Sequence, residues 1–264
     1  MSASSPKPKV AVHKFSSCDG CQLALLNLGE TLLQLAQMVE FVHFAEAGPV
    51  NPEAIADIAF VEGSVSTPED KERLERIRSN SRFLITIGAC ATAGGIQALR
   101  NFANTKQWVA AIYAKPEHIR LLDRSTPIAE HVKVDLELWG CPVTARQVLG
   151  ALRALLFGVT PAQEQDKVCL ECKRRQTVCV MVTKGLPCMG PVTRTGCGAL
   201  CPSFGRDCYA CYGPAENANT TALSRRLEGL GLLPEATTRR FRFINCGAPA
   251  FREAQPPAPE KTNG

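Results

Sequence analysis

The sequence lacks several features that would place it in a common class of protein. None of its apolar runs reaches 18 residues, which excludes a transmembrane helix. Aromatic residues make up only 6 % of the chain, too few for a base-stacking surface, and the net charge of +5 comes from scattered basic residues. No nucleic-acid partner and no membrane span are therefore expected. There is no P-loop, and Gly229-Leu230-Gly231 lacks the third glycine of a dinucleotide-binding fingerprint.

Cysteine, by contrast, is abundant. The chain has 264 residues, of which 13 are cysteine, and an odd number excludes a complete intrachain disulfide framework. The segment Met1–Lys9 has neither an apolar signal core nor a twin arginine, so the expected location is the cytoplasm. Thiols in that compartment stay reduced unless a metal binds them. Most of the cysteines are therefore predicted to be metal ligands.

The cysteines divide the chain into two predicted domains, residues 1–160 and residues 161–264. The first holds four widely spaced cysteines, and the second holds eight in a short stretch together with Cys246. The segment Thr160–Lys167 is interpreted as the linker between them. From Ala248 onward the chain is rich in proline, and this tail is predicted to be extended or mobile.

The first domain alternates between strand and helix patterns. Short apolar runs rich in β-branched residues predict strands at Val10–Phe15, Val39–Phe44, Ile58–Glu62, Phe83–Gly88 and Val134–Trp139. Helical patterns cover Gln22–Gln37, Pro68–Asn80, Gly94–Asn101 and Val143–Phe157. Such alternation predicts an α/β fold with a doubly wound parallel sheet.

The four cysteines of this domain follow predicted strands. Cys18 and Cys21 come after the first strand, Cys90 after the fourth and Cys141 after the fifth. Because functional loops of such sheets lie at the carboxyl ends of the strands, these four residues are expected to converge and to hold one metal cluster. Glu62 also ends a predicted strand, where it would either orient a loop near that cluster or be a plain strand-end carboxylate.

The second domain is expected to be irregular, with one amphipathic helix at Leu223–Leu233 and no large apolar core. Its cysteines follow the spacing C-x2-C-x6-C-x8-C-x8-C-x3-C-x6-C-x2-C. Eight thiolates make two sets of four, and each set matches either a [4Fe–4S] cluster or a structural zinc site. Zinc ribbons usually carry two C-x2-C pairs per metal, whereas each set here has one, which favours clusters.

The remaining metal-binding residue types are assigned to structural roles. Four histidines, His13, His43, His118 and His131, are dispersed without paired spacing, so core or surface positions are expected for them. Cys246 stands apart from every other cysteine and is expected to be a buried apolar thiol.

Several motifs together resemble the small, electron-transfer subunit of [NiFe] hydrogenases, soluble cytosolic group. This group includes the delta subunit of sulfhydrogenases and other NAD(P)-linked or viologen-reducing enzymes. The resemblance covers roughly residues 8–215, and Cys188-Met189-Gly190-Pro191-Val192-Thr193 is its most specific part. The other motifs are Ser17-Cys18-Asp19-Gly20-Cys21, Val61-Glu62-Gly63, Gly88-Ala89-Cys90-Ala91 and Gly140-Cys141-Pro142.

The resemblance implies a flavodoxin-like domain followed by an irregular Cys-rich iron–sulfur domain. It also implies three [4Fe–4S] clusters, with the iron ligands assigned by motif. The proximal set is Cys18, Cys21, Cys90 and Cys141; the distal set is Cys169, Cys172, Cys179 and Cys188; the medial set is Cys197, Cys201, Cys208 and Cys211. The membrane-bound branch usually has His in place of Cys169 and Pro in place of Cys201, so three four-iron clusters are expected here.

In that family the nickel–iron centre belongs to the large subunit, and the large subunit's closing Asp-Pro-Cys-x2-Cys segment is absent here. The resemblance therefore implies a chain without catalytic residues of its own. It would relay electrons between the nickel–iron site of a large subunit and a flavin or iron–sulfur reductase subunit. Two alternatives stay open: a cluster subunit of a complex-I-type NADH:quinone oxidoreductase, which would normally carry an adjacent Cys-Cys pair, and a zinc-stabilised interaction protein.

Overall fold

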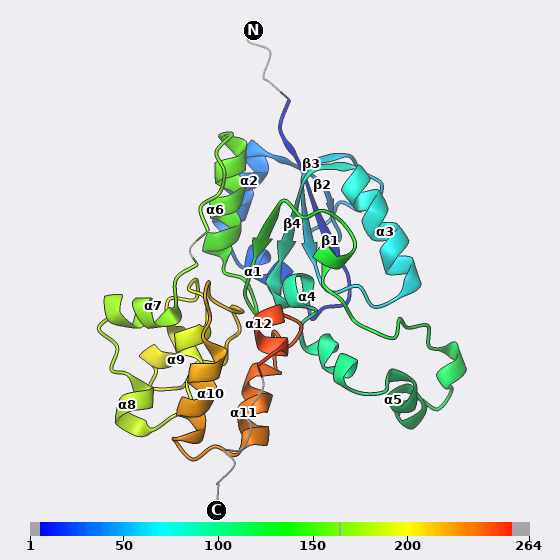
Figure 1. Cartoon of the computed structure of the whole chain (residues 1–264). Helices are drawn as coiled ribbons and strands as arrows, with labels where there is room; N and C mark the ends of the chain where they lie inside the picture. Colours follow the sequence, from blue (N-terminus) through cyan, green and yellow to red (C-terminus); the bar gives the residue numbers. More distant parts are fainter. Residues whose placement is uncertain (1–5, 164, 255–264) are drawn as a thin grey trace, which may run out of the picture. The chain divides into compact units, whose positions relative to one another are not determined.

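The computed structural model describes residues 6–163 and 165–254, and the chain divides into two compact units, 1–162 and 163–264 (Figure 1). The boundary lies inside the segment interpreted as a linker. The first five residues and residues 255–264, which include most of the proline-rich tail, lie outside the described part. No helix in the described ranges has the length and apolar character that a membrane crossing requires.

The described part of the first unit is built on a five-stranded sheet in the order β2-β1-β3-β4-β5. Every neighbouring pair is parallel, which confirms the predicted doubly wound sheet. All five predicted strands are present, within a few residues of the expected bounds. They are β1 (Lys9–Lys14), β2 (Glu40–Phe44), β3 (Ala56–Glu62), β4 (Ser81–Ile87) and β5 (Leu136–Leu138).

Helices cover both faces of this sheet (Figure 1). Alternate residues of β3 point to opposite faces: Ile58 and Phe60 join one apolar cluster, and Ala59 and Val61 join another. The first cluster packs against helices α1 (Gly20–Leu26), α2 (Glu30–Met38) and α6 (Ala145–Leu156). The second packs against α3 (Pro68–Ser79) and α4 (Gly88–Ala93). The sheet core is thus closed by protein side chains on both sides.

Two predicted helices differ in the structure. The pattern at Gln22–Gln37 forms two helices, α1 and α2, because Gly29 between them has a φ of 56°, which ends one helix before the next begins. The pattern at Gly94–Asn101 forms a 3₁₀ helix, η1 (Ile96–Phe102). The segment between η1 and β5 is not predicted to be helical. It contains α5 (Thr105–Ile112) and the short 3₁₀ turns η2 (Pro116–His118) and η3 (Ile128–Glu130).

The second unit consists of short helices joined by long turns. These helices are α7 (Val168–Arg174), α8 (Val180–Lys184), η4 (Gly190–Val192), α9 (Leu200–Ser203), α10 (Thr220–Glu228), α11 (Pro234–Phe241) and α12 (Pro249–Arg252). The helix predicted at Leu223–Leu233 is α10, which begins three residues earlier and ends at Glu228.

Although no large apolar core is expected in this unit, its residues form an apolar cluster of their own. Leu227, Phe241 and Phe251 are buried at its centre, and Cys188 and Cys208 belong to the same cluster. Phe251 lies in α12, and its ring meets that of Phe241 edge-on, with centroids 5.8 Å apart. The prediction of an extended tail from Ala248 is therefore wrong for residues 248–254, because Phe251 anchors this segment in the core.

Candidate metal centres

The first candidate centre begins in the loop after β1. Cys18 lies in that loop and is exposed, whereas Cys21 is in the first turn of α1 and is buried. Between them, Asp19 adopts a left-handed conformation with φ 64°, which turns the chain from the strand into the helix. The turn is short enough for both sulfurs of the C-x2-C pair to lie at the same edge of the sheet.

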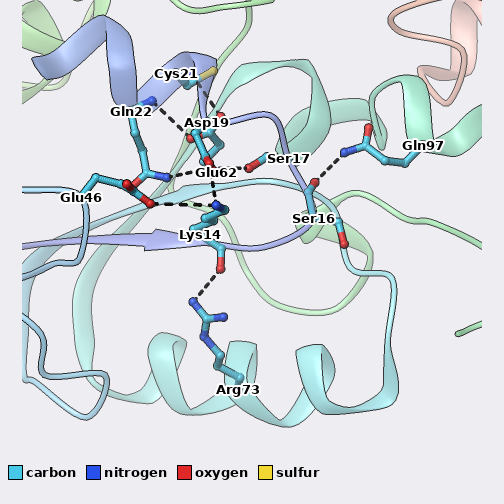
Figure 2. Close-up of polar contacts among 10 residues, drawn as sticks. All are labelled: Lys14, Ser16, Ser17, Asp19, Cys21, Gln22, Glu46, Glu62, Arg73 and Gln97. Atoms are coloured by element: carbon cyan, nitrogen blue, oxygen red, sulfur yellow. Dashed lines mark hydrogen bonds and ion pairs between the residues drawn. The ribbon is translucent and has the colours of Figure 1, made fainter. Parts of the chain in front are cut away.

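A buried carboxylate holds this loop in place (Figure 2). Glu62, at the end of β3, is only 2 % exposed. Its Oε1 accepts a hydrogen bond from the Cys21 N–H and its Oε2 one from the Gln22 N–H, both 3.2 Å long. Burial raises the pKa of Glu62, and these hydrogen bonds oppose the rise. Of the two roles that the sequence left open for Glu62, orientation of the cysteine loop is the one that the contacts support.

On its solvent side, the same loop is held by ion pairs and hydrogen bonds of partly exposed side chains. Lys14 pairs with Asp19 at 2.5 Å and with the more distant Glu46 at 3.9 Å (Figure 2). Ser17 Oγ donates to Asp19 over 3.2 Å, and an Arg73 N–H donates to the Lys14 carbonyl over 2.6 Å. These contacts fix the residue between the two cysteines from the solvent side, while Glu62 fixes the helix start from the interior.

Cys90 and Cys141 approach the same place from β4 and β5. Cys90 lies in α4, directly after β4, and its sulfur is 3.5 Å from the Gln97 side chain. Cys141 follows β5, and its peptide bond to Pro142 is cis. A hydrogen bond of 2.7 Å from the Ala89 N–H to the Gly140 carbonyl joins the two segments. The segments that carry Cys90 and Cys141 therefore lie side by side at the carboxyl ends of their strands.

Electrostatic coupling among the four thiols reflects the proximity of these segments. The pKa of Cys90 is raised to about 11, mainly by burial and to a smaller extent by the neighbouring Cys141 and Cys18, whereas the hydrogen bond with Gln97 lowers it. Burial also raises the pKa of Cys21 and of Cys141; Cys90 and Cys141 add to the effect at Cys21, as Cys18 does at Cys141. Thiols with raised pKa values are poor nucleophiles as they stand, and a metal would have to displace their protons on binding.

In the second unit, the four cysteines of the expected distal set are also neighbours. Cys169 and Cys172 are in α7, Cys179 caps α8, and Cys188 lies in the turn that follows. Burial raises the pKa of Cys172 to about 11, and Cys169, Cys188 and Cys179 contribute in that order. Cys179 is the exposed member of this set.

The expected medial set is coupled in pairs. Cys201 raises the pKa of Cys197, and Cys211 raises that of Cys208, in each case after the larger effect of burial. The two candidate sets of this unit also touch each other, because the Cys208 N–H donates to the Cys188 sulfur over 3.3 Å. The Ala210 N–H donates to the Cys208 sulfur over 3.4 Å. Backbone N–H groups directed at cysteine sulfur are the contacts that tune iron–sulfur sites.

Glycines leave room around the sulfurs. A side chain at Gly88, where φ is 87°, would collide with the Cys21 sulfur, and one at Gly95 would lie 2.6 Å from the Cys90 sulfur. A donor set made only of thiols, in a backbone cradle that excludes a Cβ, fits a bulky thiolate-bound group such as an iron–sulfur cluster. Within the described ranges, no three Cys, His, Asp or Glu side chains are arranged to hold a single metal ion.

Three features of the structure were not predicted from the sequence. Glu171, inside the Cys169–Cys172 pair, is buried and bonds to the loop that carries Cys197. His13 and His43 stack with ring centroids 4.5 Å apart on neighbouring strands, although nothing in their spacing pairs them. The third feature is readable in the sequence: residues 172–206 contain no Asp or Glu, but they do contain Lys173, Arg174, Arg175, Lys184, Arg194 and Arg206.

This acid-free segment forms a basic and apolar surface around a hollow. Arg175, Val178 and Lys184 line a hollow of about 580 Å³. Val178 and the nearby Phe204 are 67 % and 78 % exposed. Cys246, in contrast, is fully buried, and burial raises its pKa to about 11, as expected of an apolar thiol.

Comparison with known proteins identifies relatives of most of the chain. Residues 18–155 match the family described as NADH ubiquinone oxidoreductase, 20 Kd subunit. The sulfhydrogenase 2 subunit delta of Pyrococcus furiosus is 35 % identical over 89 % of this chain and 98 % of its own length. A subunit of the F420-non-reducing hydrogenase of Methanocaldococcus jannaschii is 31 % identical over 80 % of this chain and 83 % of its own length.

Solved structures agree with these relatives. A chain of an NAD⁺-reducing [NiFe]-hydrogenase in the H₂-reduced state is 31 % identical and superposes with a TM-score of 0.55, covering 59 % of this chain and 94 % of its own. A chain of the Ni-Fe-Se hydrogenase from Desulfomicrobium baculatum has the same TM-score of 0.55 at 17 % identity, over 79 % of this chain and 95 % of its own, which shows a shared fold.

Proposed function

Because this chain belongs to the hydrogenase small-subunit family, we propose that it relays electrons through three [4Fe–4S] clusters between a nickel–iron site on a large subunit and a partner reductase or diaphorase. The convergence of Cys18, Cys21, Cys90 and Cys141 on one sheet edge is the observation that carries the proposal. These four residues would hold the proximal cluster.

The second unit would hold the other two clusters. Cys169, Cys172, Cys179 and Cys188 would bind the distal cluster, and Cys197, Cys201, Cys208 and Cys211 the medial one. When bound, such a cluster takes up and releases one electron at a time. The chain itself would supply thiolate ligands and N–H donors from residues such as Ala210 and Cys208, with the sulfurs of Cys188 and Cys208 in a buried environment.

The basic surface of residues 172–206 supports a protein partner at the second unit. Cys179 is exposed beside Val178, so a cluster bound there would lie near solvent. Exposed Arg175 and Lys184 have no acidic neighbour in this stretch of sequence, which fits an electron-transfer partner with an acidic face. We propose that a flavin or iron–sulfur reductase subunit docks here, and that the complex is cytoplasmic, where thirteen cysteines stay reduced or metal-bound.

The iron, zinc and acid-labile sulfide content of anaerobically purified protein tests the proposal. Three four-iron clusters require about 12 iron and about 12 sulfide per chain with little zinc. About 4 iron with roughly two zinc would contradict it, because the second unit would then be a zinc-stabilised module. About 11 iron would indicate a three-iron centre and place Cys201 outside the ligand set.

A cluster subunit of a complex-I-type enzyme is the second candidate, because the family matched by residues 18–155 carries that description. Against it, the chain has no adjacent Cys-Cys pair and has nine further cysteines outside the matched residues. Copurification separates the two. A nickel-containing partner supports the hydrogenase proposal, and hydrogen-independent NADH oxidation by a nickel-free complex supports the alternative.

A further inference from the structure

Glu171 is a buried carboxylate whose hydrogen bonds leave its own helix. It lies in α7, between Cys169 and Cys172, and is only 7 % exposed. Its Oε1 accepts a hydrogen bond from the Gly196 N–H over 2.9 Å, and its Oε2 accepts one from the Ala199 N–H over 3.0 Å. The carboxylate of one cysteine-bearing segment therefore binds the backbone on either side of Cys197, in another.

The loop that receives these bonds has a backbone that needs support. Gly196, Gly198 and Ala199 have φ values of 132°, 66° and 52°. Ala199 is the costly one, because a side chain in the left-handed region is unfavourable by roughly 1–2 kcal/mol. Its N–H is satisfied by Glu171, and the residue is wholly buried, so water has no access to replace that bond.

The same carboxylate lies beside the Cys197 sulfur. The Cys197 thiol donates to Glu171 Oε2 over 3.7 Å. A metal-bound cysteine is a thiolate without that proton, so the contact would then bring a carboxylate next to a negatively charged ligand. Burial strengthens such a charge–charge effect, because it excludes the water that would screen it.

We infer that Glu171 is a positioning residue that fixes the Cys197 loop to the helix of Cys169 and Cys172 and makes the centre bound by Cys197 harder to reduce. The inference rests on the proposed function, because it takes Cys197 as a cluster ligand. A fixed negative charge beside a centre opposes the addition of an electron, so it lowers the reduction potential of that centre. The centre on the helix of Glu171 receives no bond from this carboxylate and should be affected less.

The test is a potentiometric titration of the holoenzyme, followed by electron paramagnetic resonance, in wild type and Glu171→Gln. The variant keeps the shape of the side chain but removes the charge. Relative to wild type, we expect the reduced-to-oxidised ratio of the Cys197 centre at a fixed potential to rise about tenfold, which is about 59 mV for one electron. Glu235→Gln is the control, because it removes the same charge from an exposed position in the first turn of α11.

Equal potentials for wild type and Glu171→Gln at full iron content would overturn the inference. If the variant assembles poorly, the identity of the missing centre decides. Selective loss of the Cys197 centre supports the inference, whereas loss of the centre bound by Cys169 and Cys172, with the Cys197 centre intact, overturns it. Wild-type metal content reports separately on the proposed function. A zinc-loaded wild type overturns both, whereas about 12 iron with equal potentials overturns only the role of Glu171.

Discussion

In both units a buried glutamate accepts hydrogen bonds from the backbone of a cysteine-bearing loop, but the glutamate comes from a different kind of element in each. In the first unit, Glu62 binds the backbone of the Cys18–Cys21 loop from β3, a central strand of the sheet. In the second, Glu171 binds the Cys197 loop from a helix that itself carries two cysteines. The first site is therefore held by the sheet, which does not depend on the cysteines. In the second unit, the cysteine-bearing segments are held by hydrogen bonds to one another.

The two units also differ in how far their cysteines take part in the apolar core. In the first unit, Cys21 belongs to the apolar cluster of the sheet, which is otherwise filled by residues such as Phe60, Ile85 and Leu152. Cys188 and Cys208 lie inside the apolar cluster of the second unit. The cysteines are thus a larger part of the apolar core in the second unit than in the first, and the following experiments test the consequence.

Anaerobic removal of iron should have the largest effect, and it should fall on the second unit. Without metal, nothing cross-links the cysteine-bearing loops of the second unit, and its apolar core is small. We therefore expect this unit to lose its protection from hydrogen exchange. The strands β1, β3 and β4 should keep theirs. Equal loss of protection in both units would break the comparison.

Gly88→Ala should abolish the first centre while leaving the second unit loaded. At a φ of 87°, a Cβ would collide with the Cys21 sulfur, and the left-handed conformation costs roughly 1–2 kcal/mol more. Iron content should fall by about 4 per chain, since one cluster is lost. Gly158→Ala is the matched control: its φ is 68°, but nothing lies within 4 Å of its Cβ. Full iron content in Gly88→Ala would show that the cradle is not needed.

Cys201→Pro should have a smaller effect within the second unit. We expect the medial centre to change toward a three-iron form, with a loss of about 1 iron per chain and a corresponding change in its paramagnetic resonance signal. Cys201 follows Leu200, the first residue of the short α9, and a proline is tolerated near the start of a helix. An unchanged four-iron signal would remove Cys201 from the ligand set.

The smallest expected effect is a pH dependence confined to the first unit. Burial lowers the pKa of His13 from 6.5 to about 3, with smaller contributions from His43 and Arg73. The unfolded chain therefore binds a proton that the folded chain does not between these values. Protonation of His13 therefore does not affect the free energy of unfolding above pH 6.5. As the pH falls from 6.5 toward 3, the free energy of unfolding decreases by about 1.4 kcal/mol per pH unit.

The measurement is the exchange protection of β1 amides at pH 7.0 and about pH 5.5, with rates corrected for intrinsic exchange. His13→Gln should lose less protection on acidification than wild type does. The exposed His118→Gln should behave like wild type. A wild type whose corrected protection is the same at both pH values would contradict the assignment.

Sequence patterns predicted the sheet because strand burial leaves a local signature. All five strands and the position of Cys18, Cys21, Cys90 and Cys141 at their ends followed from short apolar runs and chain order. The contacts of Glu62 and Glu171 had no such signature, because each joins residues 25 to 41 positions apart. Sequence periodicity can place a carboxylate on a helix or strand. It does not indicate which distant backbone N–H will donate a hydrogen bond to that carboxylate.

The helices of the second unit were missed for a related reason. Helices as short as α8 and α12 complete too few turns to show a hydrophobic period, and the Pro-rich composition from residue 248 suggested an open chain. Phe251 overrode that composition because a buried aromatic ring contributes more than the local preference of its neighbours.

The anchoring of α12 by Phe251 also sets an order of events during synthesis. A chain leaves the ribosome from its N-terminus, and domains fold as they emerge. Phe241 and Phe251 are translated after Cys211, the last of the clustered cysteines. The apolar core of the second unit therefore closes only after all eight of these thiols are outside the ribosome, which leaves them open to whatever machinery delivers iron and sulfide before the final helix packs.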